Sequence, residues 1–194
     1  MNPYLFNPRI IDLKTPEYPN DIPGDFIRLH LMENPYSLPI NVSEAIHHAL
    51  NNTVLNRYPD SNHSNLKQKL RDTFSIPDNA EILTGNGSFE LLQSVFLSML
   101  NPDQCFLSLM PGFFFYQLSS HILGQRCINV KPRENLFDTI EKHQPSLIII
   151  DNPNNPMGTI LSCDYLEKAL QAASGLVLID EAYFHYGRVT MMPF

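Results

Sequence analysis

The sequence contains few cationic residues for its length. Its 194 residues include 13 Lys and Arg against 20 Asp and Glu, which gives a formal net charge of −7. This balance argues against a general nucleic-acid-binding protein, whose affinity depends on Lys and Arg side chains that neutralise phosphates. It is compatible with one small phosphorylated ligand, because such a pocket needs only a few hydrogen-bond donors.

Cysteines are few, and long apolar runs are absent. The three cysteines form no CxxC pair, which favours reduced thiols. No apolar run approaches the roughly 20 residues that a membrane helix needs. Prolines and charges interrupt the first residues, "MNPYLFNPRIIDLKTPEYPND", and this pattern is unlike a signal peptide. We therefore expect a cytoplasmic protein without membrane contact, and no metal site.

Strand and helix patterns alternate along most of the chain. Residues 1–41 are rich in Pro, Asn and Asp and are predicted to form an extended N-terminal arm. From residue 42, short apolar runs alternate with amphipathic helices. The predicted strands are 81–85, 105–109, 125–130, 146–151 and 175–180. This alternation predicts an α/β fold of three layers, with a mainly parallel sheet between two layers of helices.

Ligands of such sheets bind beyond the carboxyl ends of the strands. Four segments lie there: "GNGSFE" (85–90), "MPGFFFY" (110–116), "DNPNNPMG" (151–158) and "DEAYFHY" (180–186). The first combines two glycines with a helix start, which suits phosphate, although a plain tight turn explains it equally well. Glu90 stands where a dinucleotide fingerprint needs its third glycine, so a dehydrogenase-type site is disfavoured.

The other three segments supply groups for a flat ligand. The aromatic residues of 110–116 either pack in the core or stack on a ring. An Asn held by the Asn-Pro pairs of 151–158 can offer its amide. Asp180 ends an apolar strand, where a carboxylate needs a partner such as an arginine or a protonated ring nitrogen. Together the segments predict a pocket for pyridoxal 5′-phosphate, which has a phosphate, a flat ring, a phenolic oxygen and a ring nitrogen.

The order of these motifs resembles the fold-type I pyridoxal-phosphate aminotransferases, most closely the histidinol-phosphate aminotransferase family. The resemblance rests on six stretches from about residue 26 to the end: "RLHLMENPYSLP", "NRYPD", "LTGNGSFELLQ", "MPGFFFY", "DNPNNPMG" and "VLIDEAY". It implies transfer of an amino group between histidinol phosphate and 2-oxoglutarate in histidine biosynthesis. A homodimer and a small phosphorylated amino-acid substrate are implied as well.

The resemblance also implies the roles of individual residues. Asp180 pairs with the ring nitrogen, while Tyr183 and Asn155 hydrogen-bond the phenolic oxygen. Phe113 stacks on the ring. Phosphate contacts are implied for Gly87, Ser88 and Phe89. Tyr58 is implied to reach the phosphate that is bound by the other subunit. Asn34 and Tyr36 are implied to lie near the substrate.

The sequence departs from the family at several positions. Phe89 replaces an Asp in the phosphate cradle, and Met157 replaces a Thr. The lysine that forms the Schiff base with the cofactor has no counterpart, because all six lysines precede Asp180 and none has the expected context. We therefore expect residues 42–194 to form a partial cofactor-binding domain that is incomplete at the C-terminus and lacks the small domain. No residue of this chain is predicted to be the catalytic lysine, and the chain alone is expected to be inactive.

Two further hypotheses remain open. A threonine-phosphate decarboxylase shares the fold, the motifs and a phosphorylated substrate, although Tyr183 modestly favours the aminotransferase. Alternatively, the chain is a non-catalytic remnant or a binding module that holds a partner through an unfinished sheet edge.

Overall fold

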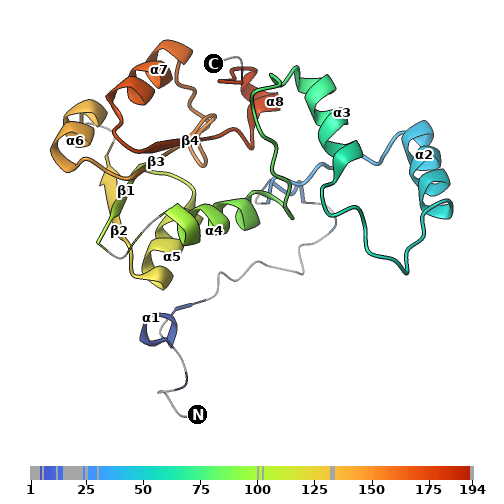
Figure 1. The fold of residues 1–194 in the computed structure, drawn as a ribbon, viewed down its shortest axis with the longest axis horizontal. Coiled ribbons are helices and arrows are strands. Elements are labelled where there is room, and N and C mark those ends of the chain that lie inside the picture. Colours follow the sequence, from blue (N-terminus) through green and yellow to red (C-terminus); the bar gives the residue numbers. More distant parts are fainter. Residues whose placement is uncertain are drawn as a thin grey trace. The chain divides into compact units, whose positions relative to one another are not determined.

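The chain divides into two compact units (Figure 1). The computed structural model describes residues 5, 7–11, 13–14, 24, 26–29, 31–99, 101, 103–131 and 134–192. One unit comprises Met1–Leu13 with Asn65–Phe194, and the other comprises Lys14–Ser64. The larger unit contains the sheet, and each unit is described by itself.

A parallel sheet of four strands forms the centre of the larger unit. The strands are β1 (Cys105–Leu109), β2 (Arg126–Val130), β3 (Leu147–Asp151) and β4 (Leu176–Asp180), in the order β2-β1-β3-β4. All three pairings are parallel. The predicted α/β class with a parallel sheet is therefore confirmed.

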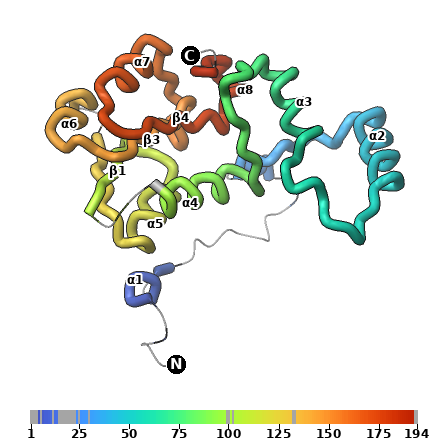
Figure 2. Tube along the Cα trace, viewed as in Figure 1, coloured from blue at the N-terminus to red at the C-terminus, as the bar shows by residue number. Residues whose placement is uncertain are grey.

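Helices cover both faces of this sheet, as Figures 1 and 2 show. On one face, α4 (Ser88–Met99) and α5 (Phe114–Leu123) pack on Phe106, Leu147 and Ile149. On the other, α6 (Leu136–His143) and α7 (Cys163–Ala172) pack on Leu107, Ile148 and Ile150. Successive residues of β3 thus serve opposite faces, and both faces are apolar because both are covered.

The strand order places a topological switch between β1 and β3. From β1 the chain crosses through α5 to β2, and it then returns through α6 to β3 on the other side of β1. The crossover helices α5 and α6 therefore lie on opposite faces, as expected when each crossover keeps the same hand. At such a switch the loops after the two strands separate and leave a crevice, which is the usual ligand position in open α/β sheets.

The strand predicted at residues 81–85 is wrong. These residues form no strand, and the Leu83 side chain is 79% exposed. A strand needs a neighbour for its backbone groups, and none of the described strands pairs with this segment. An open groove of about 760 Å³ instead separates this segment from β4, and it is lined by residues 76, 77 and 79–83 together with Ile179, Glu181, Met191 and Met192.

The remaining helices are α1 (Pro8–Ile11), α2 (Ile40–Asn51), α3 (Ser64–Phe74) and α8 (Phe184–Gly187). The α1 segment is tied to α5, since the Asn7 side chain donates to the Ile122 carbonyl over 3.3 Å. In the smaller unit, α2 buries none of its residues. The arm predicted at residues 1–41 stays a prediction.

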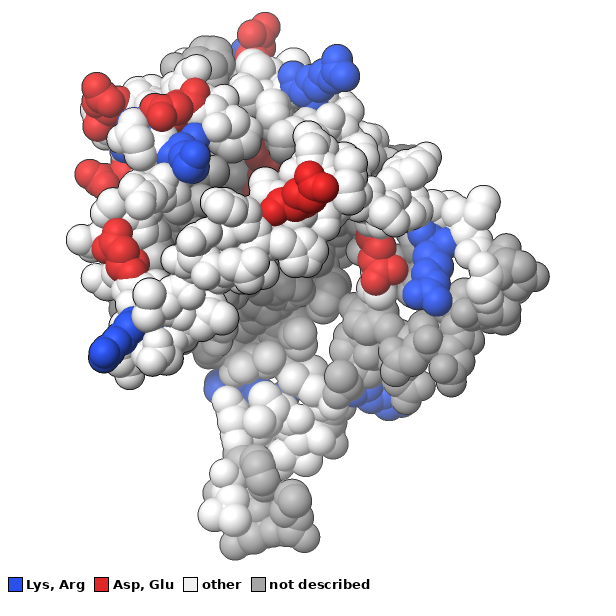
Figure 3. Space-filling model, turned by 90° about the vertical axis from the view of Figure 1, so that its right-hand side faces the viewer, with Lys and Arg blue, Asp and Glu red and all other residues white. Residues whose placement is uncertain are grey.

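Charge and helix length give two further observations. On the face drawn in Figure 3, the acidic and basic side chains of the described residues are scattered and form no continuous basic patch. None of the helices in the described ranges combines the length and apolar character that a membrane crossing demands.

Candidate functional site

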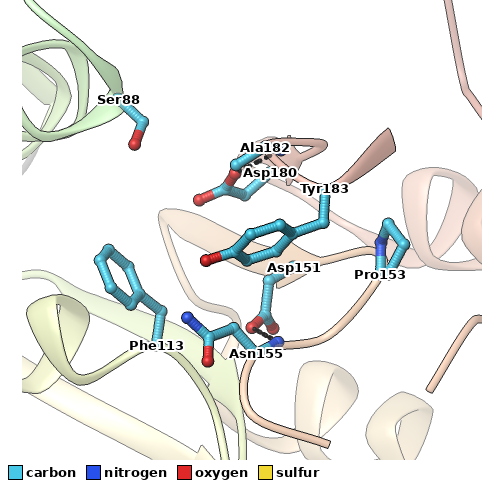
Figure 4. Close-up of a pocket in the computed structure, with 8 residues that line it drawn as sticks. All are labelled: Ser88, Phe113, Asp151, Pro153, Asn155, Asp180, Ala182 and Tyr183. Atoms are coloured by element: carbon cyan, nitrogen blue, oxygen red, sulfur yellow. Dashed lines mark hydrogen bonds between the residues drawn. The ribbon is translucent and has the colours of Figure 1, made fainter. Parts of the chain in front are cut away.

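A small pocket opens at the carboxyl ends of β3 and β4 (Figure 4). It encloses about 60 Å³, or about 320 Å³ when its open mouth is included. In Figure 4, the Tyr183 hydroxyl, the Asn155 amide and the Phe113 ring face its central space. The lining residues are Ser88, Phe113, Asp151, Pro153, Asn155, Asp180, Ala182 and Tyr183. Five of the residues predicted from the sequence therefore meet here: Ser88, Phe113, Asn155, Asp180 and Tyr183.

Asp180 reaches the pocket from the tip of β4 and is held by two donors. The Tyr116 hydroxyl donates to its Oδ2 over 2.8 Å, and the Ala182 backbone N–H donates to its Oδ1 over 3.1 Å. An ionised carboxylate has about four acceptor positions, so these two bonds leave capacity for a ligand. The side chain is only partly buried, which keeps that capacity accessible from the pocket.

Asp151 lies opposite Asp180 in the β3–β4 register and is 5% exposed. Its Oδ1 accepts from the Asn154 side chain over 3.0 Å, and its Oδ2 accepts from the Asn155 backbone N–H over 2.9 Å. Burial raises the pKa of Asp151, the charge of Asp180 adds to this, and the two donors oppose it. Asp151 therefore organises the loop that presents Asn155 to the pocket.

Asn154 joins this loop to the turn after β1. Its amide nitrogen donates to the Pro111 carbonyl over 3.0 Å, and its side-chain oxygen accepts from the Met157 N–H over 3.0 Å. The turn itself needs glycine at 112, since a Cβ there would lie 2.5 Å from the Leu109 carbonyl oxygen. This tight turn sets the position of Phe113, which precedes α5.

The start of α4 forms the side of the pocket that suits an anion. Gly87 has a positive φ of 79°, which favours glycine. Ser88 begins the helix and lines the pocket. The first N–H groups of a helix have no intrahelical acceptor, so they are available to a phosphate. Glu90 turns back to accept from the Asn86 backbone and side chain over 2.5 and 2.8 Å, which lowers its pKa.

Phe89 does not line the pocket but joins an aromatic cluster beside it. Its ring contacts Phe115 edge-on at a centroid distance of 4.4 Å and lies 5.3 Å from the Phe113 ring. The chain thus has an apolar contact at the position where the resemblance implies an acidic residue. Phe89 therefore packs beside the Phe113 ring, which lines the pocket.

Three predicted residues belong to the smaller unit. Tyr58 is fully exposed, and Tyr36 is largely exposed with its backbone N–H donating to the Asn34 side chain over 3.0 Å. The roles predicted for Tyr58, Asn34 and Tyr36 stay predictions, because the pocket is described within the larger unit alone.

The sequence motifs did not identify two residues whose side-chain hydrogen bonds organise the site, Asp151 and Tyr116. Asp151 ends an apolar run just as Asp180 does, so the pattern that pointed to Asp180 is also present at Asp151. Tyr116 is one aromatic residue among four consecutive ones, Phe113 to Tyr116. Nothing in that run distinguished the tyrosine that contacts Asp180.

Together these groups describe a site for a flat, phosphorylated heteroaromatic ligand. It offers a carboxylate with free acceptor capacity, an amide, a phenol, an aromatic face and the start of a helix. In the described part of the chain, no group of three or more His, Cys, Asp or Glu side chains is placed to hold a metal ion.

Known proteins are similar to this chain in sequence and in fold. The sequence model of the family described as aminotransferase class I and II matches residues 25–193. Histidinol-phosphate aminotransferase 2 of Nitrosococcus oceani is 35% identical over 177 residues, which are 88% of this chain and 49% of that protein. A histidinol-phosphate aminotransferase of Thiocapsa roseopersicina is 34% identical over 91% of this chain and 96% of its own length.

A solved structure gives the same likeness in three dimensions. The histidinol-phosphate aminotransferase of Sinorhizobium meliloti, in complex with pyridoxal-5′-phosphate, superposes with a TM-score of 0.66 at 25% identity. The match covers 75% of this chain and 41% of that one. The chain thus spans about half the length of the Nitrosococcus protein and less than half of the Sinorhizobium protein.

Proposed function

Because the chain belongs to the class I and II aminotransferase family, we propose that it forms the cofactor-binding part of an aminotransferase. The reaction is transfer of an amino group between histidinol phosphate and 2-oxoglutarate, with pyridoxal 5′-phosphate as cofactor. The observation that carries the proposal is the convergence of Phe113, Asn155, Asp180 and Tyr183 in one pocket at the ends of β3 and β4. The names of the similar proteins support the substrate.

The residues of the pocket have the chemistry that this cofactor needs. Asp180 would hold the ring nitrogen in its protonated form, and Tyr183 and Asn155 would donate to the phenolic oxygen. Phe113 would stack on the ring, and the start of α4 at Gly87 and Ser88 would receive the phosphate. When bound, pyridoxal phosphate supplies an electron sink for the carbanion that forms at the amino-acid carbon.

The smaller unit and a second copy complete the proposal. Tyr58 would contact the phosphate bound by the other subunit of a cytoplasmic homodimer, and Asn34 and Tyr36 would lie near the substrate. Support for these roles comes from the matching motifs at residues 28–39 and 56–60.

We propose that these 194 residues bind the cofactor but do not catalyse the amino-group transfer by themselves. None of the described residues that line the pocket is a lysine. In pyridoxal-phosphate enzymes, a lysine amine forms the covalent bond to the cofactor. The same amine transfers the proton at the substrate carbon. This chain would therefore hold the cofactor but lack the base.

Titration of the purified chain with pyridoxal 5′-phosphate, followed by cofactor fluorescence, tests the proposal. We expect saturable binding that is about tenfold tighter than for pyridoxal, because only the phosphate ester can use the start of α4. Borohydride treatment and mass spectrometry are expected to find no single lysine labelled in stoichiometric amount. Lack of saturable binding would contradict the proposal that the chain binds this cofactor. A stoichiometrically labelled lysine would contradict the proposal that the chain lacks the catalytic amine.

A matched pair of variants localises the binding. Phe113→Leu is expected to weaken binding about fivefold, since an aromatic contact contributes about 1 kcal/mol. Phe137→Leu changes a half-buried phenylalanine on α6, in the other helix layer, and should leave the affinity unchanged. Equal effects of the two substitutions would place the cofactor elsewhere.

The change that each phosphorylated amino compound causes in the spectrum of the bound cofactor distinguishes the two candidate substrates. Histidinol phosphate is expected to perturb the bound cofactor at lower concentration than threonine phosphate, with inorganic phosphate as the reference. The reverse order would favour the threonine-phosphate decarboxylase hypothesis.

A further inference from the structure

Tyr116 contacts two of the residues that line the pocket. It lies in the first turn of α5, and its side chain is 1% exposed. Its hydroxyl donates to Asp180 Oδ2 over 2.8 Å. Its ring meets the Phe113 ring edge to face, at a centroid distance of 5.6 Å and an interplanar angle of 86°. One buried side chain thus joins the turn after β1 to the tip of β4.

The hydroxyl of Tyr116 keeps its proton in this position and donates it to Asp180. Burial raises the pKa of Tyr116 far above its ordinary value, and the neighbouring charge of Asp180 raises it further. The phenol therefore stays protonated at any working pH. Because the second donor to Asp180 is the Ala182 backbone N–H, the carboxylate is fixed by one bond on each oxygen.

The geometry exceeds what packing alone requires of Tyr116. A phenylalanine would fill the same core position between α5 and the sheet, and it would keep the contact with Phe113. Among the residues that the structure describes, the hydroxyl adds a hydrogen bond with Asp180 only. That carboxylate is partly accessible and lines the pocket, so its orientation matters to a ligand there.

Building on the proposed function, we infer that Tyr116 is a positioning residue of the cofactor site. Its hydroxyl holds the Asp180 carboxylate toward the pocket, and its ring supports Phe113, which is proposed to stack on the cofactor. The Tyr116 hydroxyl thereby orients Asp180, the proposed partner of the cofactor's ring nitrogen. The Tyr116 ring packs against Phe113, the proposed stacking residue.

Substitution Tyr116→Phe separates the hydroxyl from the ring. It should weaken binding of pyridoxal 5′-phosphate about tenfold, as expected for losing a hydrogen bond to a charged group. For the carbocyclic analogue, in which a CH group replaces the ring nitrogen, the same substitution should lower the affinity less than twofold. A purely structural role would weaken both ligands equally, and equal loss would overturn the inference.

The spectrum of the bound cofactor gives a second readout that needs no analogue. Tyr116→Phe is expected to shift the pH at which the spectrum of bound pyridoxal 5′-phosphate changes, because the carboxylate beside the ring nitrogen loses one donor. The other titratable groups that line the pocket, Asp151 and Tyr183, are unchanged in this variant. An unshifted pH midpoint would contradict the role of the hydroxyl.

Tyr165→Phe serves as the matched control. Tyr165 is a half-buried tyrosine on α7, where it packs against Phe137 in the other helix layer. It should change neither affinity nor the pH midpoint. If wild type fails to bind pyridoxal 5′-phosphate, the proposed function fails. If wild type binds and Tyr116→Phe behaves as wild type does, only the role of Tyr116 fails.

Discussion

Asp151 and Asp180 end neighbouring strands in matching register, yet their surroundings differ. β3 has a strand on each side, and Asp151 is buried with its oxygens bound by Asn154 and Asn155 of its own loop. β4 has only β3 beside it among the described strands, and Asp180 is partly accessible with one oxygen bound by Tyr116 from another element. The same sequence signal thus produces one buried carboxylate that holds its own loop and one that is partly accessible in the pocket.

Asp180→Asn is expected to have the largest effect of the two matched substitutions on cofactor binding. The affinity for pyridoxal 5′-phosphate should fall about hundredfold, since the charge-assisted bond that we propose between Asp180 and the protonated ring nitrogen is lost. The free energy of unfolding should change by less than about 1 kcal/mol, because the Tyr116 hydroxyl can turn to accept from the new amide. Fluorescence titration and urea unfolding measure the two quantities.

Asp151→Asn is expected to show the opposite balance. Both Asp151 oxygens accept from N–H donors, so an amide in either orientation places its NH2 group against a donor. The free energy of unfolding should fall by about 2 kcal/mol. Cofactor affinity should fall less than in Asp180→Asn. Similar unfolding curves for the two variants would remove the distinction between the carboxylates.

The pH dependence of stability gives the smallest expected effect. Because the folded pKa of Asp151 is raised, its contribution is fully present below the ordinary aspartate pKa of about 3.9 and is lost as pH rises through the folded value. The unfolding free energy of wild type, relative to Asp151→Asn, should therefore rise as the pH is lowered toward about 4. A difference that is flat or falls on acidification would contradict burial as the dominant influence on Asp151.

Local patterns predicted most of the fold. Runs such as 146–151 identified the strands, and the amphipathic segments between them identified α4 to α7. Residues 81–85 failed because their composition suits a strand but no described strand pairs with them. A strand depends on a neighbour that is distant in sequence, and apolar composition alone does not provide one.

The pocket was predicted in part. Motifs identified Ser88, Phe113, Asn155, Asp180 and Tyr183, because each follows a predicted strand or starts a helix. Asp151 and Tyr116 were missed, since their importance lies in contacts. The hydrogen bond between Tyr116 and Asp180 spans 64 positions of sequence, and no local pattern encodes it.

The sequence by itself determined the alternation of strands and helices, the order of the motifs and the family. These follow from periodic burial and from turn residues, which act over a few positions. Only the tertiary structure decided which groups meet. The order β2-β1-β3-β4 brings residues 88, 113, 155 and 180 to one crevice. The number of neighbouring strands then decided that Asp151 is the more buried of the two carboxylates and is held by its own loop, while Asp180 stays partly accessible in the pocket, because burial controls how much water each carboxylate loses.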